Sequence, residues 1–259
     1  MSYLLAVDVG NTNTVFGLFD GDTLVRSWRI VTKKEWTSDE LGVYLNNFLQ
    51  SANYQPNSIH QAIYSSVVPS FNPILDRMIK EYYHCDPIRV VYNMKLPLKF
   101  KYPRPFELGA DRIVNAVAGI TLYGKDLIIV DLGTATTFCL IKEGDYHGGV
   151  IAPGLRMSIE ALHAKTALLP LVEFTKPPSG IIGDSTVHSI QAGFFYGWVG
   201  MLKEIINNMK AKYSETQFQV IATGGFSQMI HREVPNLFDI VDYDLTLKGL
   251  KFIFDYQKS

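Results

Sequence analysis

The sequence predicts an α/β protein built from two similar domains. Apolar runs that are typical of strands alternate along the chain with segments of helical periodicity. Sliding the chain by 123 positions aligns residues 4–22 with residues 127–145 without a gap, and seven of the nineteen pairs are identical. These pairs are Leu4/Leu127, Val7/Val130, Asp8/Asp131, Gly10/Gly133, Thr14/Thr137, Gly21/Gly144 and Asp22/Asp145. Such a repeat indicates duplicated domains, expected at residues 1–110 and 111–259; hairpins that converged independently are the alternative.

Each copy consists of an apolar strand, a D-x-G turn rich in threonine, a second strand and a Gly-Asp hairpin. Strands of the first half are expected at Leu4–Val9, Thr14–Phe19, Leu24–Val31, Ile63–Ser66 and Ile88–Val91. Thr37 or Ser38 is expected to cap a helix that reaches about Gln50, and a second helix follows Pro69. Residues 93–108 contain three prolines and four basic side chains and are predicted to form a loop.

The second half is predicted to be mainly helical after its repeat. Helices are expected at Asp111–Tyr123, from Gly154 to about Thr166, at Thr186–Lys212 and at about Thr246–Phe254. Strands are expected at Gln219–Ala222 and Ile240–Val241. In this interpretation the first of these helices connects the two halves, and the last one completes the second domain.

Composition excludes several classes of function. The formal net charge is −1, with 24 basic and 25 acidic residues and no long basic run, so a nucleic-acid partner is not expected. The two cysteines, Cys85 and Cys139, form neither a CxxC nor a Cys/His cluster, so neither a disulfide framework nor a zinc site is expected. No signal peptide is expected at the N-terminus. The long uncharged stretch Ser185–Leu202 contains Ser, Thr, His and Gln, and we interpret it as a buried helix rather than a membrane span.

The segment DVGNTNT at residues 8–14 has the composition of a phosphate-binding loop. Gly10 allows the backbone to approach an anion, and the Asn and Thr side chains add hydrogen-bond donors. Because Asp8 is itself anionic, it is expected to act on a phosphate through a metal ion or a metal-bound water. The second copy, DLGTATT at residues 131–137, repeats the element, and Thr223-Gly224-Gly225 after a strand could accommodate a nucleoside.

The segment Gly109–Arg112 (GADR) places a carboxylate beside a guanidinium at a helix N-terminus. Asp111 could accept a hydroxyl proton, while Arg112 and the helix end attract an anion. A simple capping Asp with a surface Arg is the alternative from these residues alone. A Walker A spacing at Gly119–Lys125 is rejected, because Asp126 replaces the required Ser or Thr and the run precedes a strand.

Together these motifs resemble those of the type III pantothenate kinases, a family of the acetate-kinase/Hsp70/actin superfamily. The resemblance rests on residues 8–13, 109–112, 131–134, 149–154 and 183–186, which follow the family's order along nearly the whole chain. It implies two ribonuclease-H-like domains that face a nucleotide cleft. It also implies a homodimeric cytoplasmic enzyme that uses ATP to phosphorylate pantothenate, the first step of coenzyme A biosynthesis, without a membrane or nucleic-acid partner.

The resemblance assigns roles to individual residues. Asp111 matches the catalytic proton acceptor, and Asp131 matches the ligand of a monovalent cation, K⁺ or NH₄⁺. The residues expected to bind ATP with Mg²⁺ are Asp8, Val9, Gly10, Asn11, Thr12, Asn13, Thr14, Val15 and Thr134. The residues expected to bind pantothenate are Tyr102, Gly109, Ala110, Asp111, Arg112 and Thr186.

Two other functions stay open at this point. Another small-molecule kinase of the same superfamily would contain the same duplicated D-x-G units, although Gly109–Arg112 and the short chain do not favour it. A nucleotide-binding regulator without catalytic activity could use the same scaffold. The intact candidate base and loops argue against the regulator.

Overall fold

The computed structural model describes residues 2–33 and 35–259, so Met1 and Lys34 of the expected first domain lie outside the described residues. The chain forms two compact units, one of Met1–Leu122 with Asp244–Ser259 and one of Tyr123–Tyr243. This division differs from the expected domains at residues 1–110 and 111–259. Nearly all of α3 (Ala110–Tyr123) and the whole of α7 (Leu245–Lys258) belong to the first unit, because both helices pack within it.

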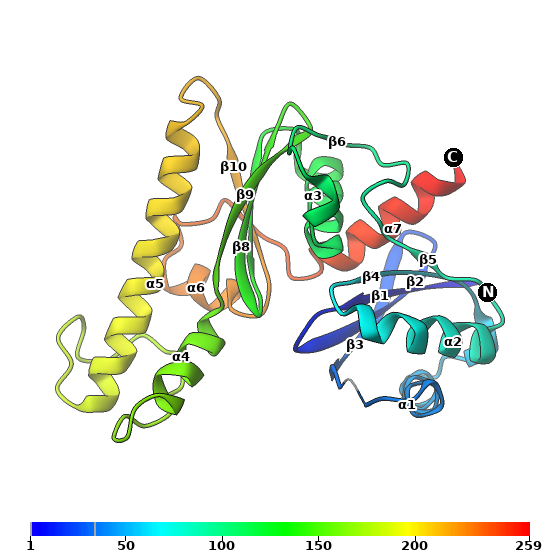
Figure 1. The fold of residues 1–259 in the computed structure, drawn as a ribbon, viewed down its shortest axis with the longest axis horizontal. Coiled ribbons are helices and arrows are strands. Elements are labelled where there is room, and N and C mark those ends of the chain that lie inside the picture. The colour runs from blue at the N-terminus through cyan, green and yellow to red at the C-terminus, as the bar shows by residue number, and fades with distance from the viewer. Residues whose placement is uncertain (1, 34) are drawn as a thin grey trace. The chain divides into compact units, whose positions relative to one another are not determined.

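The first unit contains a mixed sheet in the order β3-β2-β1-β4-β5 (Figure 1). Its strands are β1 (Tyr3–Val9), β2 (Asn13–Asp20), β3 (Thr23–Val31), β4 (Ile59–Ser66) and β5 (Ile88–Arg89). β1 pairs antiparallel with β2 and parallel with β4, so it is central and buried on both faces. The expected loop at residues 93–108 contains two short elements, β6 (Lys99–Phe100) and the 3₁₀ turn η3 (Pro105–Glu107). The other 3₁₀ turns are η1 (Pro56–Ser58) and η2 (Pro69–Phe71).

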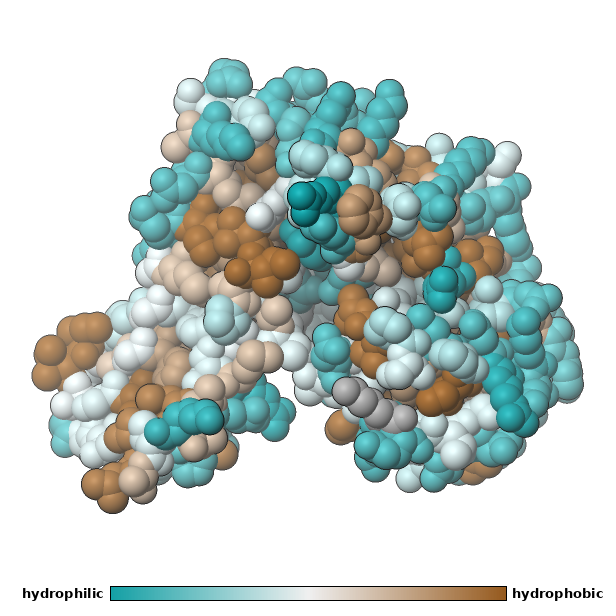
Figure 2. Space-filling model, in the orientation of Figure 1, coloured by the Kyte–Doolittle hydropathy of each residue, from teal (hydrophilic) through white to brown (hydrophobic). Residues whose placement is uncertain are grey.

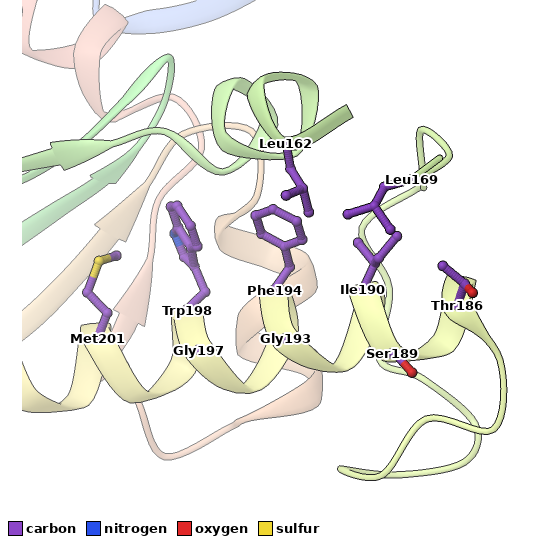
Figure 3. Close-up of a pocket in the computed structure, with 10 residues that line it drawn as sticks. All are labelled: Leu162, Leu169, Thr186, Ser189, Ile190, Gly193, Phe194, Gly197, Trp198 and Met201. Carbon is purple, nitrogen blue, oxygen red and sulfur yellow. The ribbon is translucent and has the colours of Figure 1, made fainter. Parts of the chain in front are cut away.

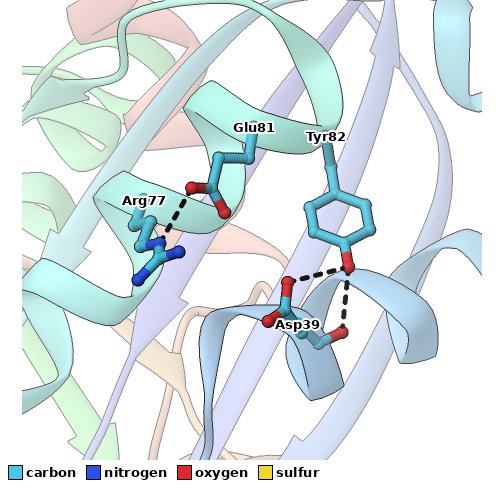
Figure 4. A network of polar contacts seen from close by, with 4 residues as sticks. All are labelled: Asp39, Arg77, Glu81 and Tyr82. Carbon is cyan, nitrogen blue, oxygen red and sulfur yellow. Dashed lines mark hydrogen bonds and ion pairs between the residues drawn. The ribbon is translucent and has the colours of Figure 1, made fainter.

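One face of this sheet is covered by α1 (Ser38–Ser51) and α2 (Asn72–Tyr83) (Figure 1). Thr37 caps α1 through a reciprocal capping box with Glu40, as its sequence predicts. The two helices also contact each other through Tyr82, whose hydroxyl donates to the Asp39 carboxylate at 3.2 Å (Figure 4). Gly42 of α1 faces the same ring, where a Cβ would come within 2.6 Å, so the close packing requires a glycine.

The opposite face of the sheet packs against α7. The alternation along β1 directs Leu5, Val7 and Val9 into the cluster formed with α1 and α2. Ala6 pairs with Gly17 of β2, and a Cβ on Gly17 would lie 3.0 Å from the Leu247 side chain of α7. Residues of β1 with even numbers, Asp8 among them, therefore belong to the face that α7 covers.

Polar and steric contacts attach α7 to the first unit. A Cβ on Gly249 would lie 2.3 Å from the backbone oxygen of Val114, so α3 and α7 touch backbone to backbone at this glycine. Thr246 donates a hydrogen bond to the side chain of Asn115 at 2.8 Å. Lys251 is buried and donates to Asp22 of the β2–β3 hairpin at 2.8 Å, as well as to Asp255. These contacts explain why the C-terminal helix belongs to the first unit.

The second unit repeats the three-stranded start of the first. Its strands follow the order β11-β10-β7-β8-β9, and β10 runs parallel to β7. They are β7 (Leu127–Leu132), β8 (Ala135–Lys142), β9 (Asp145–Pro153), β10 (Gln219–Thr223) and β11 (Ile240–Val241). Its helices are α4 (Leu155–Ala164), α5 (Thr186–Ala211) and α6 (Ser227–Glu233), the last of which the sequence patterns did not indicate.

The structural repeat is offset by one residue from the gapless sequence alignment. Asp8 pairs with Val15, whereas Asp131 pairs with Thr137, so the turn after β7 is one residue shorter. The structural counterpart of Thr14 is therefore Thr136 rather than Thr137. The pairing irregularities at Leu18/Phe19 and Leu140/Ile141 obey the same offset, which shows that both copies share one meander.

Helix α5 is only partly buried within the chain. Ile190, Phe195 and Leu202 enter the core of the second unit, whereas Gly193, Gly197 and Gly200 are exposed. Within the single chain, the helix that was expected to be buried at Ser185–Leu202 is therefore exposed on one side. Among the described residues, no helix is both long enough and apolar enough to cross a bilayer.

Candidate active site

The first D-x-G loop follows β1 and is closed by its own backbone. The Gly10 amide donates to the Asn13 carbonyl at 3.0 Å, and a Cβ on Gly10 would come within 3.1 Å of that oxygen. Thr32, which follows β3, fixes the loop from outside: its amide donates to the Thr12 carbonyl at 2.9 Å and its hydroxyl to the Gly10 carbonyl at 2.8 Å. The loop is thus tied at both ends of its turn, which favours a defined set of donors for an anion.

Asp8 lies at the carboxyl end of β1, beside the end of the parallel strand β4. Asp8 and Ser65 are register partners on the two strands, and the Ser65 hydroxyl donates to Asp8 Oδ1 at 2.5 Å. The negative charge of Asp111 acts on the same carboxylate. Two predicted site residues that are far apart in the sequence, Asp8 and Asp111, are therefore near enough for the charge of one to raise the pKa of the other.

Asp111 begins the first turn of α3. Its Oδ1 accepts a hydrogen bond from the Arg112 amide at 2.8 Å, and the same N–H also donates to the Gly109 carbonyl at 3.1 Å. A Cβ on Gly109 would lie 2.4 Å from the same carboxylate oxygen, so only glycine leaves room for this arrangement. Burial raises the pKa of Asp111 above its ordinary value, against the lowering effect of the Arg112 amide and guanidinium. A carboxyl with a raised pKa is better suited to accept a proton near neutral pH.

The two carboxylates lie in an environment that disfavours their charges. Burial raises the pKa of Asp8 from 3.8 to about 6, and Asp111 adds to the rise, whereas Ser65 and, more weakly, Arg29 lower it. Carboxylate oxygens are ligands that suit Mg²⁺, and a divalent cation would offset both charges. Among the described residues there is no cluster of three or more His, Cys, Asp or Glu side chains that could hold a metal.

In the second unit, Asp131 occupies the position at the end of β7 that Asp8 occupies at the end of β1. In the parallel pair of β7 and β10, Asp131 lies beside Thr223. The next residue, Gly224, has a φ of +88°, and a Cβ there would lie 2.6 Å from Asp131 Oδ1. Gly154, at the start of α4, contacts the loop after β7 so closely that a Cβ would lie 1.9 Å from the Thr134 carbonyl. Three motifs that are separate in the sequence therefore meet within this unit.

Thr186 lies at the first position of α5 and is exposed. The segment Gly183–Ser185 forms the cap of this helix: Ser185 accepts from the His188 amide at 3.2 Å, and His188 contacts Asp184. A groove of about 700 Å³ extends from Thr186 along α5 (Figure 3). Its walls are largely apolar and come from α4, α5 and the segment after α4: Leu162, Leu169, Thr186, Ser189, Ile190, Gly193, Phe194, Gly197, Trp198 and Met201.

The remaining predicted site residues are distributed as follows. Val9, Asn11, Thr14 and Val15 belong to the first D-x-G loop and its flanking strands, and Ala110 precedes Asp111 in α3. Tyr102 lies in the segment between β6 and η3. The sequence patterns missed Ser65 and Thr32; the adjacency of β1 and β4 could have indicated Ser65, but no local pattern indicated Thr32.

The raised pKa of Asp8 predicts that this carboxylate destabilises the protein without ligands. The native state retains the proton up to about pH 6, whereas the unfolded chain releases it near pH 3.8. The contribution of Asp8 to stability therefore falls as pH rises through this window. In EDTA, Asp8→Asn should raise the free energy of unfolding by about 1–3 kcal/mol at pH 8, and the gain should vanish near pH 4. Urea titrations at both pH values measure this; Asp86→Asn, which removes a surface carboxylate, is the control, and an equal gain at both pH values would contradict the prediction.

Comparisons with known proteins agree with this geometry. Residues 4–208 match the family described as type III pantothenate kinase. The type III pantothenate kinase of Geobacillus kaustophilus is 49% identical over 97% of both chains.

Two solved structures share the fold alone. A conserved protein from Campylobacter jejuni described as a Baf family transcriptional activator has a TM-score of 0.61 at 20% identity, over 98% of both chains. The activator of the 2-hydroxyisocaproyl-CoA dehydratase from Clostridium difficile, solved with bound ADPNP, has a TM-score of 0.51 at 10% sequence identity. The match covers 99% of this chain and 95% of that one. The chain belongs to the type III pantothenate kinase family.

Proposed function

We propose that this protein transfers the γ-phosphoryl group of ATP to the hydroxyl of pantothenate, the first step of coenzyme A biosynthesis. The observation that carries the proposal is the position of Asp8 at the carboxyl end of β1, where the charge of Asp111 reaches it, in a chain that belongs to this family. Phosphoryl transfer has a loose transition state, so catalysis depends mainly on positioning and on compensation of charge. The enzyme would act in the cytoplasm.

Asp111 is the proposed general base. The acceptor is a primary alcohol, whose proton must leave as the new P–O bond forms. The position of Asp111 at a helix N-terminus, its bond to the Arg112 amide and its raised pKa support this role. Tyr102, Gly109, Ala110, Arg112 and Thr186 are the proposed contacts of pantothenate.

Asp8 and the loop that follows it are proposed to hold ATP with Mg²⁺. Bound Mg²⁺ would neutralise charge on the phosphate oxygens. Asp8 would orient waters of the ion, and the turn closed by Gly10 and Asn13 would present amide and hydroxyl donors to phosphate. The hydrogen bond between Gly10 and Asn13 would hold these donors in place before the nucleotide binds.

Asp131 is the proposed ligand of a monovalent cation, and Thr134 is a proposed ATP contact. The carboxylate of Asp131 lies against the backbone of Gly224. At this point the parallel strands β7 and β10 end side by side, at Asp131 and Thr223. A monovalent cation at this corner would offset the charge of Asp131 near a bound triphosphate.

We also propose that the protein is a homodimer through α5. The groove along α5 is apolar, and a Cβ on Gly193 or Gly197 would meet nothing within 4 Å of the single chain. Leu168 and Ile182, near the groove in the sequence, are 91% and 78% exposed. Figure 2 shows apolar atoms protruding at the lower left, where Figure 1 places α4 and the start of α5. Apolar surface of this kind typically marks an interface.

Substitution of the proposed base should abolish most of the turnover. Asp111→Asn retains the shape of the side chain but cannot take a proton, so kcat should fall by about 10²–10⁴-fold. ATP affinity, measured by calorimetry, should change little. Asp86→Asn, which removes an exposed carboxylate paired with Lys80, should retain full turnover. If Asp111→Asn keeps more than about a tenth of wild-type kcat, Asp111 is not the base.

Activity should require a monovalent cation in addition to Mg²⁺. With sodium as the only monovalent cation, ADP release in the presence of pantothenate should be slow, and potassium or ammonium should restore it, because the proposed site at Asp131 is one for K⁺ or NH₄⁺. Asp131→Asn should reduce this response. Identical rates in sodium, potassium and ammonium would remove the cation assignment.

A charge on the exposed side of α5 should separate the proposed dimer. Gly197→Arg should halve the molar mass measured by light scattering, because a guanidinium cannot be buried unpaired in an apolar contact. Asn207→Arg places the same side chain on an exposed position farther along α5 and should leave the mass unchanged. A wild-type protein that is monomeric and fully active at assay concentration would rule the dimer out.

A further inference from the structure

The fully buried hydroxyl of Ser65 has no role in the function proposed so far. Ser65 is 0% exposed, at the carboxyl end of β4, and its Oγ lies 2.5 Å from Asp8 Oδ1. A buried hydroxyl that donates to an anion forms a charge-assisted bond, which is shorter and stronger than a neutral one. A serine that served packing alone could be replaced by alanine with little change in volume.

The sheet fixes this contact rather than a mobile side chain. Asp8 and Ser65 are register partners in the parallel pair of β1 and β4, and the pairing continues beyond them through the Val67 amide, which donates to the Val9 carbonyl at 3.0 Å. Ser66, the next residue, instead closes a local turn with the backbone of Val68. The two adjacent serines therefore make different contacts, since only the Ser65 hydroxyl bonds to Asp8.

We propose that Ser65 is a positioning residue that holds the Asp8 carboxylate in the orientation used to bind Mg²⁺ with the nucleotide. The inference rests on the proposed function. With Oδ1 occupied by the Ser65 hydroxyl, rotation of the carboxylate is restricted. No hydrogen bond to Oδ2 is found in the described part of the chain, so that oxygen can accept from a metal-bound water.

The Ser65 hydroxyl also offsets part of the electrostatic repulsion between Asp8 and Asp111. Both carboxylates lie on the same corner, and the Ser65 hydroxyl directs the positive end of its dipole at Asp8. Without it, the Asp8 side chain could turn away from Asp111, and the oxygen that accepts from the metal-bound water would no longer be preorganised. The cost would fall on Mg²⁺ binding more than on the binding of pantothenate.

The test compares Ser65→Ala with Ser65→Thr, which retains a hydroxyl, and with Ser66→Ala as the matched control. Ser65→Ala should raise the Mg²⁺ concentration for half-maximal activity by about tenfold, with the KM for pantothenate within about twofold. Calorimetry should show that the gain in ATP affinity on replacing EDTA by Mg²⁺ shrinks by a similar factor. Ser65→Thr should restore much of the Mg²⁺ response, and Ser66→Ala should lower thermal stability alone.

The outcomes separate this inference from the proposed function. If wild-type protein does not phosphorylate pantothenate, the proposed function fails, and the calorimetric comparison still tests Ser65. If wild type is active and Ser65→Ala retains the wild-type Mg²⁺ dependence in both measurements, the positioning role is wrong. Should Ser65→Thr not fold, because its extra methyl group is buried, the comparison of Ser65→Ala with Ser66→Ala decides the question.

Discussion

The site depends on the central position of β1 in the first sheet. Because β1 is flanked by β2 and β4 and covered on both faces, most of its residues are buried, and the Asp8 carboxylate at its end is partly desolvated. Apolar neighbours such as Leu5 and Val7 stabilise the strand, and the charge at its end is carried at a cost. If the proposed Mg²⁺ binds here, it meets a carboxylate that has already lost part of its hydration.

The second carboxylate depends on the contact between two helices. Gly249 allows α7 to touch the backbone of α3, and α3 presents Asp111 at its N-terminus. Lys251 ties α7 to the hairpin between β2 and β3, so the C-terminal segment stabilises the same unit that carries the proposed base. The chemistry of the first unit therefore relies on residues from both ends of the chain.

The duplicated meander is used differently in the two units. In the first, Thr14 shares a hydrogen bond of 2.9 Å with the Thr32 hydroxyl, which also holds the D-x-G loop. In the second, the counterpart Thr136 is buried, and no partner for its hydroxyl is found in the part of the chain that the structure describes. The backbones of Gly154 and Gly224 pack closely against the residues of this shorter turn. Duplication thus supplied one framework, and different residues adapted each copy.

The sequence alone determined the elements whose signals are local. Periodicity placed β1, β2, α3 and α5 within a few residues, and the capping box of α1 was visible at Thr37. The D-x-G and GADR motifs supplied the residues of the proposed site. The family resemblance, which the comparisons confirmed, rested on the same short motifs.

Only the tertiary structure decided what depends on contacts between distant residues. The return of α7 to the first unit depends on a backbone contact at Gly249, and the offset of the repeat depends on strand pairing that a gapless alignment does not reveal. Ser65 joined the site because β4 lies parallel to β1, and an otherwise ordinary strand serine became the donor to Asp8. Hydrogen bonds and register between strands are set by packing across the whole unit, so no local pattern could specify them.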